Sequence, residues 1–437
     1  MAATLLIIWM SPLKIRFKAF KIHSFHVVVS RVGLASLVPK MAPNRTRLRY
    51  SIAVFIAVCL PIVATAFPTP AAGRRRAPAS AEIRAIYLTG AMAGSLHGRL
   101  LAGKWRALGG NAVVFDIKDW DGDVSFNSPQ PLAHPNPYTY IRNLPAWVGW
   151  LHAHGLYAIA RIALFKDARL AQAHPELAVH TAQGGIWLDR GHSVWLDPSL
   201  PAVQNYDLGL AAEAARAGAD EIQFDYVRFP VGGDQKTCRF RYQNLNPRLR
   251  RTGVISEFLH HARKTLHPYG VYISIDVFGI TAWARPADVL ATGQDITALA
   301  HQADIICPMI YPSHFFHHFD HLANPADEPG LLIHDALARF NQRVRNTPAV
   351  IRPWLQAFAW HTPIFSPGYI ETQVATARSL HAKGFMLWNA ENRYVPAERA
   401  MRAMAATPGK YFRGGFPYPL PRMTAENAPR RGADRME

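Results

Sequence analysis

Two aspartates end apolar segments of this 437-residue sequence, and their positions suggest acid–base chemistry. Asp225 ends the run Glu221–Asp225, and Asp276 ends the run Val271–Asp276. An apolar run that ends in aspartate brings a carboxylate to the edge of a dry core, where it needs a partner or a cleft. Two carboxyl groups that face one another can cleave a glycosidic bond, because one protonates the leaving oxygen while the other attacks or activates water.

The surroundings of the two aspartates predict different roles. Arg228 lies three residues after Asp225, and Arg161 could also approach it; a positive charge would keep Asp225 ionised, as a nucleophile requires. Apolar residues flank Asp276, which would raise its pKa and suit a general acid. A single aspartate of this kind is as often a helix cap or an ion-pair partner, but several at one mouth favour a catalytic pair. The roles could be exchanged, or one member of the pair could be Asp116 or Asp119.

Further polar and aromatic residues follow the same apolar runs and are predicted to contact a substrate. Aromatic rings stack on the apolar faces of sugars, although each ring taken alone is more often part of a core. The basic residues would suit an anionic glycan, but they are equally suited to pair with the aspartates. The predicted substrate-binding residues are Asp116, Lys118, Asp119, Arg161, Tyr226, Arg228, Tyr311, His314, Gln356, Trp388 and Asn389.

Other kinds of site receive little support. The segment His314–His321 contains four histidines, but it lacks the matched ligand spacing of a metal site, so neither a metal nor a cofactor is expected. His314 is the most credible functional histidine of the four, as a hydrogen-bonding group or proton carrier. The sequence has no Gly-x-Ser-x-Gly elbow, P-loop or His-Glu-x-x-His motif, which argues against serine hydrolases, phosphotransferases and zincins.

A repeated strand–helix unit must position these residues. From residue 81 onward, short β-branched or aromatic runs alternate with helical stretches, and the turns from helix to strand are short and contain glycine. Eight such units predict a single-domain (β/α)8 TIM barrel, whose strand C-terminal ends would carry the functional residues. The predicted strands are Arg84–Leu88, Ala112–Ile117, Tyr157–Ile162, Glu221–Asp225, Val271–Asp276, Ile305–Ile310, Arg352–Phe358 and Phe385–Trp388.

The N-terminal region differs from the rest in charge. The formal charge of +18 includes twelve Lys and Arg and no acidic residue in residues 1–80, so no nucleic-acid partner is expected of the barrel. A basic head, a short apolar run and Ala64-Thr65-Ala66 indicate a signal peptide. We interpret residues 1–40 as a start-site artefact or disordered extension, 41–66 as the signal peptide, 67–81 as a flexible lead-in, 82–395 as the barrel and 396–437 as a tail.

These features predict an exported protein, periplasmic or secreted. It would contact a membrane only through an uncleaved signal segment, and it is expected to be a monomer with a carbohydrate substrate. Cys238 and Cys307 are predicted to be unpaired thiols, because a core of this size needs no disulfide framework.

Several longer motifs occur in a fixed order within roughly residues 82–395: FDIKDWDG (115–122), DEIQFDYVRFP (220–230), DIICPMIYPSH (304–314) and MLWNAENRY (386–394). In these the chain resembles a family of bacterial TIM barrels described as glycoside hydrolase-like domains of otherwise unknown function. The resemblance implies an amylase-like architecture with Asp225 as the fourth-strand catalytic carboxylate. The amylase-like pattern has Glu at the position of Asp276 in this chain and Arg at the position of Gln223. The resemblance therefore does not assign the proton donor.

The sequence thus predicts a glycoside hydrolase that acts on a poly- or oligosaccharide. The alternative is a non-catalytic glycan-binding or envelope-scaffolding barrel that uses the same aromatic residues. A weaker third interpretation is a hydrolase of an ester or amide in an envelope polymer, for which the sequence offers no activated nucleophile.

Overall fold

A computed structural model describes residues 82–133, 139–190 and 193–413 of the chain. The predicted signal peptide and the segments on either side of it, residues 1–81, lie outside the described residues, as do residues 414–437. No helix of the described part is long and apolar enough to cross a membrane.

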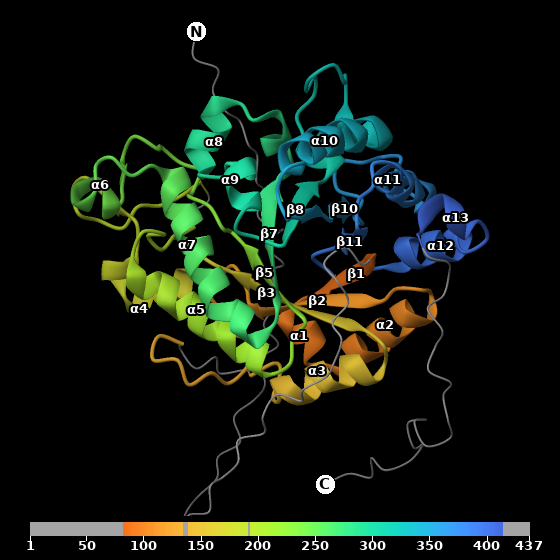
Figure 1. The fold of residues 1–437 in the computed structure, drawn as a ribbon, viewed down its shortest axis with the longest axis horizontal. Coiled ribbons are helices and arrows are strands. Elements are labelled where there is room, and N and C mark those ends of the chain that lie inside the picture. Colours follow the sequence, from red (N-terminus) through yellow and green to blue (C-terminus); the bar gives the residue numbers. More distant parts are fainter. Residues whose placement is uncertain (1–81, 134–138, 191–192, 414–437) are drawn as a thin grey trace, which may run out of the picture. The chain divides into compact units, whose positions relative to one another are not determined.

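Eight parallel strands close into a barrel (Figure 1). Each strand pairs with the next in chain order, β11 pairs with β1, and β8 pairs with β10. The strands are β1 (Ile83–Leu88), β2 (Ala112–Lys118), β3 (Tyr157–Ala163), β5 (Glu221–Asp225), β7 (Tyr272–Phe278), β8 (Ile305–Ile310), β10 (Trp354–Gln356) and β11 (Gly384–Trp388). The short β9 (Val350–Ile351) pairs with β8 beside β10. This arrangement confirms the predicted (β/α)8 barrel.

Helices follow the strands and surround the barrel in Figure 1. They are α2 (Leu96–Ala107), α3 (Leu144–Ala153), α5 (Pro201–Arg216), α7 (Arg251–Leu266), α9 (Ile296–Ala300), α10 (Pro329–Val344), α11 (Pro367–Ser379) and α12 (Val395–Met404). No helix was predicted over α10, although its buried residues Leu332, Ile333, Ala336, Leu337 and Phe340 follow a helical period. Helix α12 continues past residue 395 and buries Met401 and Met404.

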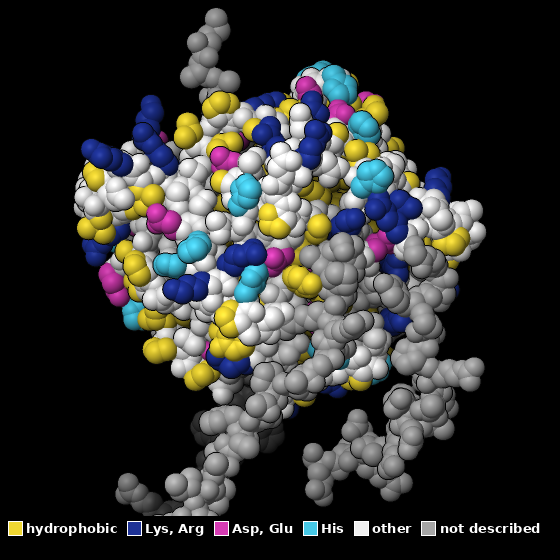
Figure 2. All heavy atoms as spheres, viewed as in Figure 1, with side chains coloured by type: hydrophobic (Ala, Val, Ile, Leu, Met, Phe, Trp, Pro, Cys, Tyr) yellow, Lys and Arg dark blue, Asp and Glu magenta, His cyan; other side chains and the backbone are white. Residues whose placement is uncertain are grey.

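Smaller elements occupy the loops. They are α1 (Gly90–Ala93), α4 (Ala168–Ala173), α6 (Tyr242–Leu245), α8 (Pro286–Thr292), α13 (Pro408–Tyr411) and the antiparallel pair β4 (His180–Thr181) and β6 (Cys238–Arg239). Short 3-10 helices span Pro175–Leu177, His267–Tyr269, Gly279–Trp283, Pro312–His314 and Pro325–Asp327. Cys238 and Cys307 are buried free thiols, as predicted. On the face shown in Figure 2, Lys and Arg side chains are dispersed and do not form one band.

Alternate residues of each strand fill the barrel interior, as the two-residue period of a strand requires. On β5 these are Glu221, Gln223 and Asp225. Contacts across the barrel show it: the Gln223 amide donates to the Met386 sulfur at 3.4 Å, and Glu221 pairs with Arg352. The same period places Asp225 at the C-terminal end of the interior, so the fold positions the strand-end aspartates in the uppermost layer of the barrel core.

Candidate functional site

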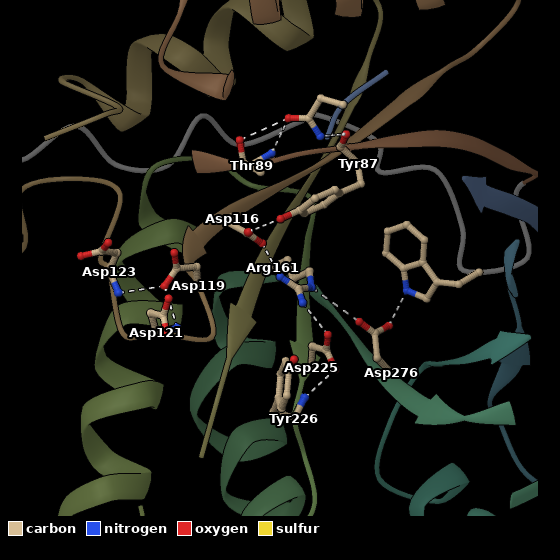
Figure 3. Close-up of polar contacts among 12 residues, drawn as sticks. Tyr87, Thr89, Asp116, Asp119, Asp121, Asp123, Arg161, Asp225, Tyr226 and Asp276 are labelled. Carbon is tan, nitrogen blue, oxygen red and sulfur yellow. Dashed lines mark hydrogen bonds and ion pairs between the residues drawn. The ribbon is translucent and has the colours of Figure 1, made fainter. Parts of the chain in front are cut away.

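One guanidinium joins the strand-end carboxylates (Figure 3). The Arg161 side chain on β3 contacts an Asp116 oxygen and an Asp225 oxygen, each at 2.5 Å, through its two terminal nitrogens. Its Nε lies 3.9 Å from Oδ2 of Asp276. The four residues come from β2, β3, β5 and β7, which are neighbours in the barrel. We call Asp116, Arg161, Asp225 and Asp276 the Arg161 cluster.

Hydrogen bonds fix the orientation of each carboxyl group in the cluster. The Tyr87 hydroxyl donates to Asp116, and the Trp354 indole donates to Oδ1 of Asp276 at 2.7 Å. The backbone N–H of Tyr226 donates to Oδ1 of Asp225 at 2.6 Å. Each bond leaves little rotational freedom, so the acidic groups are held in place before any ligand binds.

The cluster holds three carboxyl groups and one cation, and this excess changes proton affinities. Burial and the Asp225 carboxylate raise the pKa of Asp276 well above its ordinary value, although Arg161 acts in the opposite direction. Burial likewise raises the pKa of Asp116. Asp276 and Asp116 are 1% and 2% exposed, whereas Asp225 is 7% exposed. The expectation that an apolar setting raises the pKa of Asp276 is confirmed.

Asp119 lies beside the cluster, in the loop that follows β2. Its carboxylate accepts backbone N–H groups of Asp121 and Asp123 at 3.0 and 2.9 Å (Figure 3). Burial and the Asp116 carboxylate raise its pKa to about 7. Asp119 is half-buried, so it is a more accessible proton donor than Asp276.

The other predicted site residues divide into two groups. Tyr311 and Trp388 lie with the cluster. The Asp276 and Asp225 carboxylates add to the effect of burial in raising the pKa of Tyr311, and Trp388 stacks on Tyr87 with ring centroids 4.1 Å apart. His314 is exposed at the rim, where it contacts Tyr311.

Three predicted substrate-binding residues have their polar groups bonded elsewhere in the protein. The Lys118 ammonium is fully buried between Asp167 and Asp207, 3.0 and 2.7 Å away. The Gln356 amide is completely buried and bonds to the backbone and Thr362. The Asn389 amide donates to the Ala357 and Arg393 carbonyls, and its oxygen accepts the Glu391 N–H. The structure does not bring these three into the cluster.

Arg228 lies close to Asp225 in sequence but makes no ion pair with a described carboxylate. Its guanidinium lies over the rings of Trp195, Tyr226 and Phe278, with distances to the ring centroids of 4.7, 5.3 and 4.4 Å. Tyr226 has a φ of +54°, a left-handed conformation that costs free energy in a residue other than glycine and is often found at functional sites.

Three residues of the site were not predicted to bind or act on a substrate: Tyr87, Trp354 and Lys166. Tyr87 and Trp354 hold the carboxyl groups of Asp116 and Asp276. Tyr87 continues the inward period of β1 after Ala85, which is a signal that could have identified it. Lys166, in the loop after β3, lies over the rings of Trp120 and Tyr226 at 4.3 and 5.4 Å.

Of the aromatic residues near the strand ends and in the loops that follow them, only some have partly exposed rings. Trp120, Trp360 and Trp388 are half-buried, and they can offer part of a face to a sugar. The others are buried and support the core: Tyr87, Trp187, Trp195, Tyr226 and Tyr311.

Two further features lie away from the strand ends. Asp320, His321 and Asp335 place ligand atoms within 4.8 Å of one another, so they could hold a metal ion, but Asp320 also pairs with Arg339. A groove of about 630 Å³ lies between α10 and α11, lined by residues that include Leu331 and Tyr369. Neither feature adjoins a carboxyl group of the Arg161 cluster.

The cluster can therefore act on a bound molecule through both states of a carboxyl group. An ion-paired carboxylate and a neighbouring carboxylic acid are the two groups that general acid and nucleophilic or general base catalysis require. The carboxylic acid can protonate a leaving oxygen while the carboxylate attacks carbon or activates water.

Comparisons with known proteins give the family and the fold. The profile of a putative glycosyl hydrolase domain matches residues 85–394. A hypothetical protein from Ruminiclostridium thermocellum ATCC 27405 is 35% identical over 44% of this chain and 97% of that chain, with a TM-score of 0.39. No curated protein sequence matches the chain.

Two solved structures share the fold at low identity. The PgaB (BpsB) glycoside hydrolase domain from Bordetella bronchiseptica is 14% identical over 74% of this chain and 98% of that chain, with a TM-score of 0.55. Alpha-L-fucosidase isoenzyme 2 from Paenibacillus thiaminolyticus is 12% identical over 76% of this chain and 50% of that chain, with a TM-score of 0.52. At these identities the similarity shows the barrel fold alone.

Proposed function

This chain belongs to the putative glycosyl hydrolase domain family, and on that premise we propose that it hydrolyses a glycosidic bond of a poly- or oligosaccharide by a two-carboxylate mechanism. The observation that carries the proposal is the excess of carboxyl groups in the Arg161 cluster. The cluster gathers three carboxyl groups around one guanidinium at the strand ends, where TIM-barrel enzymes carry their catalytic residues.

Asp225 is the nucleophile or general base in this proposal. Its carboxylate is held by the Arg161 guanidinium and the Tyr226 backbone N–H, so one orientation is fixed before substrate binds. It is also the most exposed carboxyl group of the cluster. A fixed carboxylate at the edge of the cluster can approach the anomeric carbon, or the water that attacks it, without first reorganising.

Asp276 is the general acid. Burial and the neighbouring Asp225 keep its proton bound at a pH where an ordinary aspartate is ionised. The Trp354 indole holds one of its oxygens, so the other is available for a leaving oxygen. After transfer of the proton, Arg161 stabilises the Asp276 carboxylate that forms.

Asp116 and Tyr87 position the guanidinium. The Tyr87 hydroxyl and the Arg161 guanidinium bind different oxygens of Asp116, which ties the cluster to β1. Trp388 stacks on Tyr87 and is half-buried, so it can also provide a surface for a sugar ring.

A second candidate is a glycan-binding barrel without catalysis. The observation that favours it is the burial of Asp276, whose 1% exposure would restrict access to a leaving oxygen. Under this alternative the cluster is a structural ion-pair network, and only the half-buried tryptophans contact the glycan.

The test is a screen of the full chain for sugar release from a panel of poly- and oligosaccharides, with bound glycan measured in parallel. The proposal expects release of sugar by the wild type, and loss of turnover with retained binding in Asp225→Asn and Asp276→Asn. Asp288→Asn is the matched control, because Asp288 on α8 is also buried and its pKa is also raised by burial, yet it lies outside the cluster.

Each outcome separates the candidates. If the wild type binds a glycan but releases no sugar, the binding barrel is correct. If Asp225→Asn turns over as fast as Asp288→Asn, the assigned pair is wrong. With an active wild type, NMR of the first product shows whether the anomeric configuration is retained or inverted.

A further inference from the structure

Two cations lie beside the Arg161 cluster without joining it. Lys166 follows β3, two residues after Leu164, whose backbone N–H donates to the Asp225 carbonyl at 2.9 Å. Arg228 follows β5, and its backbone N–H donates to the Tyr226 carbonyl at 2.8 Å. Both residues therefore follow strand C-terminal ends, that of β5, which carries Asp225, and that of its neighbour β3.

The two cations share one aromatic neighbour. The Lys166 ammonium lies 5.4 Å from the centre of the Tyr226 ring, and the Arg228 guanidinium lies 5.3 Å from the same centre. Trp120 covers the ammonium from another side at 4.3 Å, and Trp195 contacts the guanidinium at 4.7 Å. Such rings stabilise a cation through their faces and leave its N–H edges available.

Within the described part of the chain, no carboxylate pairs directly with either cation, although Asp189 and Asp225 attract both at longer range. Arg228 is only 5% exposed. Its one side-chain hydrogen bond to a described residue is from Nη1 to the Phe229 carbonyl at 3.1 Å. By contrast, the buried Lys118 has two carboxylate partners.

The Arg228 charge disfavours the charged form of Lys166. Burial and the nearby Arg228 lower the pKa of Lys166 to about 8. Like charges in a partly dry setting cost free energy, and packing alone would be served as well by one cation or none. An anion bound between them would remove that cost.

We propose that Lys166 and Arg228 bind an anionic substituent of the glycan, a uronate carboxylate or a sulfate ester, next to Asp225. The proposal rests on the proposed function, since it assigns the substrate class of the same site. The guanidinium edge can bind two oxygens of either group, and the ammonium adds a point charge. The half-buried Trp120 ring lies where it can stack on the sugar that carries the anion.

The test measures binding, not turnover. Ligand-observed NMR titrations of the full chain would use methyl glycosides of glucuronic and galacturonic acid, methyl glucoside 6-sulfate, and neutral methyl glucoside and galactoside. We expect at least one acidic glycoside to bind about tenfold or more tightly than its neutral counterpart, because a charge-assisted pair of hydrogen bonds contributes at least that much. Uronates and the sulfate ester in separate titrations identify the anion.

Variants locate the effect. Arg228→Gln and Lys166→Gln should each weaken the acidic glycoside about tenfold and leave the neutral one unchanged, and Lys166→Arg should largely restore binding. Arg285→Gln and Lys410→Gln are matched controls, because each cation lies over one ring elsewhere, Phe319 and Tyr411 respectively. If Arg228→Gln fails to fold, the Lys166 pair of variants still decides.

The failures of the two proposals are distinguishable. Equal binding of acidic and neutral glycosides, binding of none, or acidic binding that survives both Gln variants overturns the anion subsite even if the enzyme hydrolyses a neutral glycan. Acidic binding that is lost in the Gln variants supports the subsite, and it does so even if no glycan is hydrolysed, which would overturn the proposed function alone.

Discussion

Two arginines inside one barrel have different partners. Arg352 bonds both oxygens of Glu221 through Nη1, at 3.0 and 2.8 Å, and both residues are at most 1% exposed. Arg161 is almost as buried, but it contacts three carboxyl groups. Glu221 and Asp225 stand four residues apart on the same strand, so β5 contributes to both sites.

The two sites differ in charge balance, and this difference supports the proposed catalytic role of the Arg161 cluster. The Arg352 pair is neutral as a unit, so it satisfies its own charges. The Arg161 cluster carries more acid than base, and burial together with the Asp225 carboxylate raises the pKa of Asp276, which costs stability when that group ionises. An arrangement that stability alone does not favour, at the end of the barrel where enzymes of this fold act, is the kind of site that the proposed function requires.

The largest expected effect is on turnover. Asp225→Asn should lower kcat about 10³-fold or more, since it removes the group that acts on the anomeric carbon. Glu221→Gln, two interior layers below on the same strand, should change kcat of the folded protein less than about threefold. Steady-state kinetics on a substrate found in the glycan screen would measure both. Comparable losses of kcat in the two variants would erase the distinction between the sites.

The next largest effect is on stability, and here the larger loss is expected at the Arg352 pair and the smaller at the Arg161 cluster. Arg352→Met leaves Glu221 buried without a counterion and should lower the free energy of unfolding by about 3–5 kcal/mol. Asp276→Asn should lower it far less, or raise it, because it removes part of the acid excess. Urea denaturation followed by tryptophan fluorescence measures both. A loss under 1 kcal/mol in Arg352→Met would show that Glu221 finds another partner.

A smaller effect is the pH dependence of that stability. Because the pKa of Asp276 is raised on folding, the folded chain holds this proton after the unfolded chain, with a pKa near 3.9, has lost it. The stability that protonated Asp276 contributes to the folded chain is fully present below about pH 4 and is lost as pH rises through the folded pKa. Relative to wild type, Asp276→Asn should therefore be more stable at pH 8 than at pH 5, by about 1 kcal/mol or more.

Urea denaturation at the two pH values tests this dependence. Glu391→Gln is the control, because Glu391 is exposed and lies outside the cluster. A difference between Asp276→Asn and wild type that does not change with pH would mean that Asp276 titrates alike in the folded and unfolded chain.

The barrel could be predicted from the sequence because each strand is a separate apolar run and short glycine-containing turns lead from helix to strand. Helix α10 was missed, since it follows a long segment rich in His, Phe and Pro that obscures its start at Pro329. The strand-end aspartates were predicted because strand period and strand end place them together. That reasoning needs only local sequence and the geometry of a parallel barrel.

Side-chain partners across the barrel could not be predicted in the same way. Lys118 follows Asp116 closely on β2, but a register shift between them turns its ammonium toward Asp207 on α5. Trp354 reaches Asp276 from 78 residues away. Such contacts depend on how strands meet in three dimensions, which spacing along the chain does not encode.

The smallest expected effect decides between two proton donors. A general acid must be protonated, so kcat falls as pH rises through its pKa. The pKa of Asp119 is raised to about 7, whereas that of Asp276 is raised well above its ordinary value.

With Asp276 as the acid, Asp119→Asn should lower kcat less than about tenfold and leave the alkaline limb of the kcat–pH profile in place. A wild-type limb near pH 7 that disappears in Asp119→Asn would instead assign the acid to the half-buried loop residue. The Arg161 cluster would then serve to orient Asp225, and its acid excess would act on catalysis through the Asp116 charge that raises the pKa of Asp119.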